Sequence, residues 1–520
     1  MFSLMFPSTA DTVLLRRSTA SALRNAVVRR LAALVVTAVV VAAPALSGAR
    51  LVAQAPLIPH TITYAPGKSI TLAMPRGLTV DVAATGLKRV RFLTMSPDNR
   101  VFATGMFNLA DNTNGSVYIL EGWDAATQRY THVTHYLDHL RNPNNLAFYT
   151  EPASGGNPGA MWLYVPLTDK LVRYRYNPGD EAPSSEPEVL IRWPDYGLSY
   201  KYGGWHLTRT VAVANLHGHT RVYVATGSSC NYCQEREVAR AAILSMNPDG
   251  SDQKVVAHGM RNAVDLRWVP EVDGGALFAT NMGDDHLGDQ LPEDTFFELD
   301  SNSHAGPIAA ATAPNYGWPT CYFAHGKAVH DSTPLPTTST ENDPKVTSAQ
   351  TPQVKAHRKA NADSVYGYQQ GVAAAGTNLA AGGGHADGVD PNAALGKPPA
   401  PLSDCSQVPA AYTTFAAHSS PLGMAYFDAK SPILGGTGGS FVVAQHGASH
   451  PHIGTGYRLV RFTAQDRTPK PLITGFLGGG ITSAKVDGRP CGLLILGPDT
   501  FLLTDDYLGL VYIVHPVKAQ

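Results

Sequence analysis

The sequence has no surplus of charge of either sign. Lysine and arginine together number 40 and aspartate and glutamate 41, so the formal net charge is −1. A nucleic-acid-binding protein normally carries a basic patch or stripe, which such a balance does not favour. The chain also has few long apolar stretches with helical spacing, whereas its 49 glycines and 38 prolines are typical of many turns that join short strands. We therefore expect an all-β protein that does not bind nucleic acid.

After residue 60 the sequence lacks any apolar run long enough to span a bilayer. Before it, five arginines precede the apolar run LAALVVTAVVVAAPAL, which is broken by Pro44 and followed by small residues. This order is typical of a signal peptide. We assign residues 1–55 to a signal peptide or membrane-proximal export segment, with an uncleaved anchor as the alternative, and residues 56–520 to the mature domain. That domain is expected to be periplasmic or secreted, with no stable membrane span.

Cysteine is scarce, with five in 520 residues. Cys230 and Cys233 form CNYC, but a glutamine follows where a haem-attachment motif would have histidine. No second Cys/His pair at ligand spacing accompanies them, which disfavours a zinc site. In an oxidising compartment we expect a local disulfide between Cys230 and Cys233. A second bridge is expected between Cys321 and Cys405, which leaves Cys491 unpaired.

Short apolar segments recur along the chain. They are VFATG at 101, LYVP at 163, VYVATG at 222, LFATNMG at 277, FVVAQHG at 441 and FLLTDD at 501. Four of the five intervals are about 60 residues, which suits one four-stranded blade with its loops. The other interval contains residues 327–400, which are poor in large apolar groups and so cannot build blades. The pattern predicts a six-bladed β-propeller with a long, partly disordered low-complexity insertion between the fourth and fifth repeats.

Polar clusters lie at the strand or blade junctions of this pattern. The segments GWHLTRT, YVATGSSCNYC, MNPDGS, HGMRNAV, LGDQLPEDT, NYGWPTCY, HSSPLG, GYRLVRF and GRPCG follow one another in this order. As a series they resemble the glucose/sorbosone dehydrogenase family of six-bladed quinoproteins, from about Pro75 to His515 with the insertion excepted. The resemblance implies pyrroloquinoline quinone as cofactor, with Ca²⁺, and oxidation of a sugar or sugar aldehyde at the funnel mouth. An external acceptor would take the electrons, because the chain has no haem motif.

The implied chemistry needs a base and several cationic groups. Hydride leaves a substrate carbon only as the hydroxyl proton is removed, and the cofactor carries three carboxylates. By resemblance, His206 is the base; the alternative is a histidine hydrogen-bonded under the Trp205 turn. Arg261 and Asn262 would contact the quinone oxygens, and Arg261 would also bias charge during hydride transfer. Arg489 would bind a cofactor carboxylate, with a turn-closing arginine bound to backbone carbonyls as the alternative.

The resemblance also implies a cation site and further pocket residues. The carbonyls of Gly283 and Asp284 would hold the cofactor calcium, and Asp294 would support a structural calcium nearby. The alternative is that Asp284, Asp285 and Asp289 are solvated turn acids. His446 and His418 are expected to line the cofactor or substrate pocket.

Some features depart from the family pattern. Ser228 stands where the soluble glucose enzymes carry an aspartate that orients the base, and QHGASHPH, residues 445–452, replaces a more cationic segment. Asp265 stands where the family usually has glycine, and its carboxylate would repel an anionic cofactor unless it points away. Arg209 either belongs to the site or is a structural residue paired with a carboxylate. Two other functions therefore stay open: a cofactor-free propeller that acts as an extracytoplasmic binding scaffold, and a calcium-dependent lactonase.

Overall fold

The computed structural model of the chain describes residues 56–109, 112–193, 206–235, 237–335, 391–479 and 483–517. The expected export segment and residues 336–390 lie outside the described residues. Among the described residues, no helix is long and apolar enough to cross a membrane. Regular structure there is almost entirely β-strand. The helical segments are four short 3-10 turns: η1 (Pro307–Ala309), η2 (Ala393–Leu395), η3 (Cys405–Gln407) and η4 (Pro451–Ile453).

The described residues form six four-stranded antiparallel sheets. The first two are β4 (Val90–Met95), β5 (Val101–Gly105), β6 (Gly115–Asp124) and β7 (Arg129–Leu140), then β8 (Ala147–Thr150), β9 (Met161–Pro166), β10 (Lys170–Tyr176) and β11 (Glu188–Arg192). The next two are β12 (Arg209–Leu216), β13 (His219–Thr226), β14 (Ala242–Met246) and β15 (Lys254–His258), then β16 (Ala263–Val269), β17 (Ala276–Asn281), β18 (Asp294–Ser301) and β21 (Thr413–Phe415). The last two are β22 (Pro421–Phe427), β23 (Ser440–Gln445), β24 (Arg458–Phe462) and β25 (Lys470–Ile473), then β28 (Pro490–Gly497), β29 (Thr500–Asp505), β30 (Leu510–Pro516) and β3 (Leu78–Ala84).

The first strands of neighbouring sheets lie next to one another, as β12 lies beside β16 and β28 beside β4. This is a six-bladed β-propeller, so the predicted fold class is confirmed. All six recurring sequence segments form the second strand of a sheet: β5, β9, β13, β17, β23 and β29. These strands are buried on both faces between neighbouring blades, which explains their continuous apolar runs.

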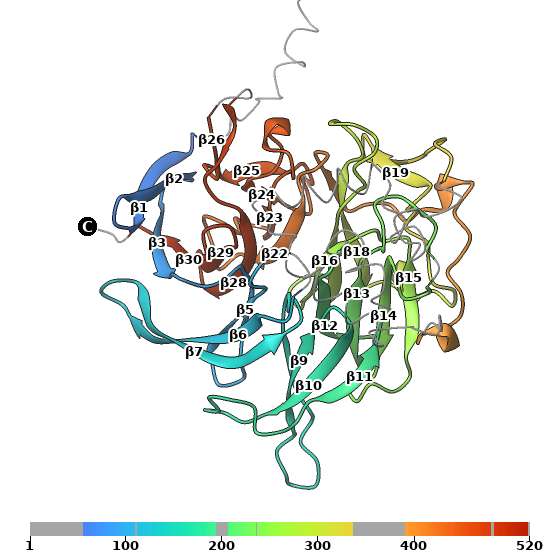
Figure 1. Cartoon of the computed structure of the whole chain (residues 1–520), viewed down its shortest axis with the longest axis horizontal. Helices are drawn as coiled ribbons and strands as arrows, with labels where there is room; N and C mark the ends of the chain where they lie inside the picture. Colours follow the sequence, from blue (N-terminus) through green and yellow to red (C-terminus); the bar gives the residue numbers. More distant parts are fainter. Residues whose placement is uncertain are drawn as a thin grey trace, which may run out of the picture. The chain divides into compact units, whose positions relative to one another are not determined.

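The two ends of the domain close the ring in one sheet. β3, from the N-terminal part of the chain, pairs with β30 in a register that runs from Leu78 opposite Pro516 to Ala84 opposite Val511. Figure 1 shows β3, in blue, beside the red β30. Main-chain hydrogen bonds therefore join the first and last parts of the propeller.

Three hairpins are added to the blades. They are β1 (Ile58–Ala65) with β2 (Lys68–Met74), β19 (Cys321–Ala324) with β20 (Lys327–His330), and β26 (Leu477–Gly478) with β27 (Lys485–Val486). The first hairpin is linked to the region after β25 by the bridge between Ala73 and Thr474. Its residues Ile70 and Leu72 are buried in the cluster that also contains Leu472 and Phe476.

Clusters of buried apolar side chains fill the space between neighbouring blades. In one of them, the ring centroids of Phe278 and Phe296 lie 4.7 and 5.1 Å from that of Phe441 in the next sheet. In another, the rings of Phe102 and Tyr176 are 5.9 Å apart. Because each blade packs on two neighbours, the core is distributed around the ring instead of being central.

A small apolar cluster lies at the axis itself. Phe92, Val264, Leu422 and Cys491 come from the first strands β4, β16, β22 and β28, and each is at most 2% exposed. On one side of this cluster is a cavity of about 250 Å³, lined by later residues of the first strands such as Asp265. The axis is therefore filled by side chains in its middle.

The insertion lies inside the fourth sheet. It separates β18 from β21, so it lies between the fourth and fifth recurring segments. Its expected first residues, 327–330, form β20, which pairs with β19 in a hairpin outside the four-stranded sheets. The expected bounds 327–400 stay a prediction. At the other end, Asn392 donates to the carbonyl of Arg192 at 3.0 Å.

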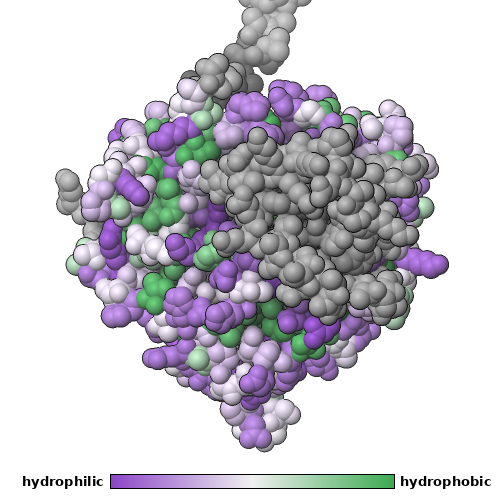
Figure 2. All heavy atoms as spheres, viewed as in Figure 1, coloured by the Kyte–Doolittle hydropathy of each residue, from purple (hydrophilic) through white to green (hydrophobic). Residues whose placement is uncertain are grey.

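Hydrophilic residues cover much of the coloured surface in Figure 2, with hydrophobic residues interspersed between them. The exposed large apolar side chains lie on different elements, for example Phe107 after β5, Trp123 on β6 and Ile495 on β28. Single exposed apolar residues of this kind are ordinary in soluble domains.

We expect Phe501→Ala on β29 to lower the free energy of unfolding by about 3–5 kcal/mol, because it empties a fully buried site whose ring packs 5.5 Å from Phe427. Ile495→Ala in the same sheet, at an exposed position, is the control and should cost less than about 1 kcal/mol. Urea denaturation followed by fluorescence measures both. Equal losses would contradict the assigned core.

Candidate functional site

The sheet register gathers one set of loops at one end of the axis. In each sheet the start of the first strand pairs with the end of the second, as Arg209 pairs with Thr226 and Pro490 with Asp505. The loops before first strands and after second strands therefore meet at the same end, here named the site end. The predicted residues near these junctions are His206, Arg261, Asn262, His418 and Arg489 before first strands, and Gly283, Asp284 and His446 after second strands.

His206 lies just before β12 with its backbone in the left-handed region, at φ 46°. A non-glycine residue with positive φ is uncommon and costs conformational energy unless its surroundings hold it. Here Arg209 holds it, because Nη1 of this fully buried arginine donates to the His206 carbonyl at 2.7 Å. The structure thus places Arg209 as the support of the histidine backbone.

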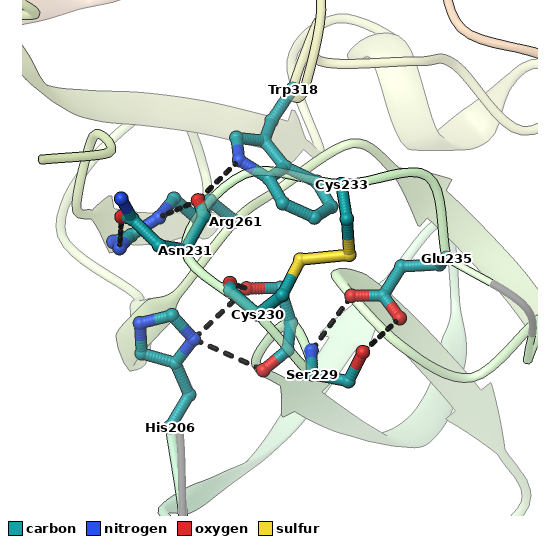
Figure 3. Close-up of a disulfide and its surroundings, with 9 residues drawn as sticks. His206, Ser229, Cys230, Asn231, Cys233, Glu235, Arg261 and Trp318 are labelled. Atoms are coloured by element: carbon teal, nitrogen blue, oxygen red, sulfur yellow. Dashed lines mark hydrogen bonds between the residues drawn. A yellow bond between two sulfur atoms is a disulfide. The ribbon is translucent and has the colours of Figure 1, made fainter. Parts of the chain in front are cut away.

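The imidazole of His206 is oriented by Ser228. Its Nδ1 is 2.9 Å from Ser228 Oγ and 3.1 Å from the Ser228 carbonyl (Figure 3). Ser228 Oγ donates its own hydrogen to the carbonyl of Cys230 at 2.6 Å, so it acts as an acceptor toward the histidine. Nδ1 therefore carries the proton, and Nε2 is the basic nitrogen. Serine and its carbonyl perform here the orienting role for which the sequence comparison expected an aspartate.

The charge state of His206 follows from its surroundings. Burial lowers its pKa well below the usual 6.5, and the charge of Arg261 lowers it further, while the hydrogen bond to Ser228 and the charge of Asp285 act in the opposite direction. The imidazole is therefore neutral at pH 7, as a proton acceptor must be.

Arg261 is buried and fixed by one neighbouring residue above all. Its Nε donates to the Asn231 carbonyl at 3.0 Å, and its Nη2 donates to Asn231 Oδ1 at 2.7 Å. Its Nη1 donates to the Gly283 carbonyl at 2.6 Å, and Asp285 Oδ2 is 3.4 Å from Nη2. The Ser228 amide in turn donates to the Arg261 carbonyl at 2.7 Å. The guanidinium and the histidine are thus attached to the same loop.

Asn262 and His206 both lie close to Gly227. A Cβ at Gly227 would lie 2.4 Å from the His206 Cβ and 2.7 Å from Asn262 Oδ1, so a larger residue would need one of these groups to shift. Among the described residues, Asn262 Oδ1 is one of the buried atoms with no hydrogen-bond partner. Such an acceptor can receive a hydrogen bond from a ligand.

Both expected disulfides are present, Cys230–Cys233 and Cys321–Cys405, and Cys491 is a buried free cysteine. The first closes the loop that carries Asn231 and directly follows Ser228 and Ser229. Beside it, Glu235 accepts from the amide and the hydroxyl of Ser229 at 2.7 and 2.8 Å. Burial raises the pKa of Glu235 to about 7, against the lowering charge of Arg240.

His418 adds a second cation beside Arg261. Its Nδ1 is 3.1 Å from Asp285 Oδ1, and its Nε2 donates to the Gly288 carbonyl at 2.8 Å. The hydrogen bond to Asp285 is the main cause that raises the pKa of His418 to about 9. Desolvation would raise the pKa of Asp285, but His418 and Arg261 lower it to about 2. At neutral pH, Arg261 and His418 are therefore positively charged and Asp285 between them is negatively charged.

Asp506 is the residue that the sequence interpretation missed. It directly follows β29, is 1% exposed, and lies 2.8 Å from both Arg91 and His446 and 3.4 Å from Arg89. Burial opposes its ionisation, but His446 and the two arginines hold its pKa far below the ordinary value. Its position in the repeat could have identified it, because the end of FLLTDD corresponds to the ends of NMGDD and AQHG in other repeats.

The His446 ring is held by this carboxylate through Nε2. Burial lowers its pKa to about 4, although Asp506 acts to raise it. His450 and His452, by contrast, are exposed. The three histidines of QHGASHPH therefore do not converge on one point.

Arg489 is bound by the loop after β23. Its donors meet the carbonyls of His446, Gly447 and Ala448 at 3.3, 2.9 and 3.0 Å, and the Tyr457 hydroxyl at 2.9 Å. This geometry matches the turn-closing alternative of the sequence interpretation. A cofactor contact by Arg489 stays a prediction.

Two of the three residues expected at calcium sites have protein donors on the atoms in question. The Gly283 carbonyl accepts from Arg261. Asp294 accepts from the Gly283 amide, the Ser419 hydroxyl and the Ser420 amide at 2.8 to 2.9 Å, and burial raises its pKa to about 6. The Asp284 carboxylate, which is not the carbonyl expected to bind, lies 2.8 Å from His286 Nδ1. Both calcium assignments stay predictions.

Asp265 points away from the site end. Its Oδ2 accepts from the Met424 amide at 2.8 Å and lies 3.5 Å from Arg267, and the residue lines the cavity on the other side of the axial cluster. The Asp265 carboxylate therefore points away from the site end, which is the case in which we expected no repulsion of an anionic cofactor.

No protein-family model matches the chain. No curated protein matches it either. Solved structures do: the pyranose dehydrogenase PQQ domain from Coprinopsis cinerea, in its holo form, has a TM-score of 0.53 at 16% identity and covers 86% of this chain and 97% of its own. This chain shares its fold. A Trichoderma reesei structure from carbohydrate-active enzyme family AA12 has a TM-score of 0.54 at 14% identity and covers 86% and 98%. These neighbours agree with the sequence resemblance to sugar dehydrogenases at the level of the fold.

We expect Asp506→Ala to lower the free energy of unfolding at pH 7 by about 3–5 kcal/mol, because it leaves buried arginines without their counter-charge. The depressed pKa means that this contribution is complete above the unfolded carboxyl pKa and is lost only as pH falls through the folded value. Thermal and urea denaturation measure it. Glu181→Ala, which removes an exposed carboxylate, is the control and should have no measurable effect.

Proposed function

We propose that the protein is a pyrroloquinoline-quinone-dependent dehydrogenase that oxidises a sugar or sugar aldehyde, with His206 as the general base. The observation that carries the proposal is the fixed tautomer of His206. Ser228 binds the protonated Nδ1, and a neutral imidazole with a basic Nε2 lies beside a buried arginine at the site end of the propeller. The pyranose dehydrogenase domain of the same fold supports the choice of cofactor and substrate class.

The residues at the site end fit such a cofactor in part. Arg261 and the protonated His418 supply positive charge for a ligand with three carboxylates, whereas the orphaned atom of Asn262, Oδ1, is an acceptor and does not match a quinone oxygen. Arg489 is bound to loop carbonyls and His446 to Asp506, so these two residues would support the site without a direct cofactor contact. No step of the proposal depends on calcium.

The proposed reaction divides the work between ligand and protein. Pyrroloquinoline quinone would supply a hydride acceptor for the substrate carbon, and an external acceptor would take the electrons. His206 accepts the hydroxyl proton at Nε2, while Ser228 keeps the ring from rotating. Arg261 supplies fixed positive charge where negative charge develops, and its position costs no reorganisation because protein acceptors already hold it.

Reconstitution tests the cofactor assignment. We expect the purified chain to bind pyrroloquinoline quinone at micromolar concentration, seen by cofactor absorbance, and then to reduce a dye in the presence of an aldose or sugar aldehyde. Calcium is added and omitted in parallel arms. An absence of binding in both arms would overturn the enzyme proposal in favour of a binding scaffold.

His206→Ala tests the base. We expect it to keep cofactor binding while kcat falls by about 10²- to 10⁴-fold, the usual contribution of a general base. Because burial and Arg261 lower the histidine pKa, wild-type kcat/KM should be flat from pH 7 down to below 6.5 and decrease only at lower pH. Loss of cofactor binding in the variant would show that His206 has another role.

A further inference from the structure

The loop closed by the Cys230–Cys233 disulfide contacts both residues assigned to the chemistry. Ser228, just before it, binds the Nδ1 of His206, and Asn231, inside it, binds Arg261 with its backbone carbonyl and its side-chain oxygen. Figure 3 shows His206, Asn231 and Arg261 on the same side of the disulfide. Asn231 Oδ1 also accepts from the amide of Asp285 at 3.0 Å, so it links two loops of neighbouring blades.

We infer that Asn231 is a positioning residue that holds the Arg261 guanidinium beside His206, and that the Cys230–Cys233 disulfide holds Asn231 in place. The inference concerns this chain's own contacts; its catalytic meaning rests on the proposed function. Asn231 suits the role because it offers two acceptors from one residue to two donors of one guanidinium. Such a paired contact fixes the direction of the planar group as well as its distance.

The surroundings of the disulfide explain how the loop keeps its shape. Both cysteines are buried against Ala241 and Trp318. The indole Nε1 of Trp318 donates to the Asn231 carbonyl at 3.2 Å, the same carbonyl that binds Arg261 Nε. Asn231 therefore lies between two cysteines that are bonded to each other, and the indole N–H donates a hydrogen bond to its carbonyl.

The charge of Arg261 affects the pKa of His206, so the position of the guanidinium can be followed through that pKa. The charged groups that face the His206 imidazole are Arg261, Asp285 and Arg209, in addition to the Ser228 carbonyl. Of these, Arg261 lowers the histidine pKa most after burial itself. If the guanidinium turns away, the pKa of His206 rises toward the ordinary histidine value.

The first experiment uses the full chain without added cofactor. The imidazole nitrogens are titrated by ¹⁵N NMR in wild type, Asn231→Ala and the control Asn215→Ala, and His206→Gln assigns the signal. Asn215 lies in the same sheet as β13, and its amide donates at the surface to Thr220. We expect the His206 titration to move to higher pH in Asn231→Ala and to stay at the wild-type value in Asn215→Ala. An unchanged titration in a folded Asn231→Ala would overturn the inference.

The second experiment removes each disulfide in turn. We expect Cys230→Ser/Cys233→Ser to move the His206 titration in the same direction as Asn231→Ala. Cys321→Ser/Cys405→Ser removes the other disulfide, and we expect it to leave the titration unchanged. Equal shifts in both double variants would mean that general loosening, and not the position of Asn231, causes the effect.

Kinetics of the reconstituted protein separate this inference from the proposed function. We expect Asn231→Ala to reduce kcat by about 100-fold, as displacement of a positioned group does. The acid limb of its kcat/KM profile should move to higher pH. If wild type is inactive with pyrroloquinoline quinone but the NMR titration responds, the proposed function fails and the positioning contact stands. If wild type is active and Asn231→Ala matches it in kcat and pH profile, the positioning role fails alone.

Discussion

The pairing of β3 with β30 is the contact on which the rest of the structure depends. It joins strands from opposite ends of the domain and so closes the ring of blades. Only in a closed ring does β28 lie beside β4. That neighbourhood brings Asp506, at the end of β29, to Arg89 and Arg91 at the start of β4. Closure by hydrogen bonds therefore also assembles the buried charges at the axis.

Charge at the site end alternates over short distances. Asp285 lies between the cations Arg261 and His418, and Asp506 is paired with Arg89 and Arg91 and also contacts His446, which is neutral at pH 7. Each carboxylate is ionised because cations surround it, and each buried arginine is tolerated because it has acceptors. In this setting His206 stays neutral, although a histidine nearby, His418, is held protonated. The same residue type thus has two charge states within one site, set by the nearest partner.

The sequence predicted the fold well because the second strands of the blades are buried on both faces and so read as continuous apolar segments. It also placed His206, Arg261 and His418 correctly at one end, because the loops at equivalent strand ends must meet there. The partners were beyond prediction: nothing in GRPCG says that Arg489 binds carbonyls of a loop some 40 residues earlier. The direction of Asp265 and the role of Asp506 depend on contacts between blades, which local sequence does not encode. The hairpin at the start of the insertion was also beyond prediction, because β20 is only four residues long.

The cluster of Phe92, Val264, Leu422 and Cys491 has a kinetic consequence. It fills the axis, so a molecule bound at the site end must leave by the way it came. In a dehydrogenase of the proposed kind, the sugar and the electron acceptor would then have to bind in turn through the same opening at the site end. The oxidised product would have to leave before the acceptor binds, which is a ping-pong scheme. An excess of either reactant would then inhibit binding of the other. The packing of four side chains would thus set the order of the two half-reactions.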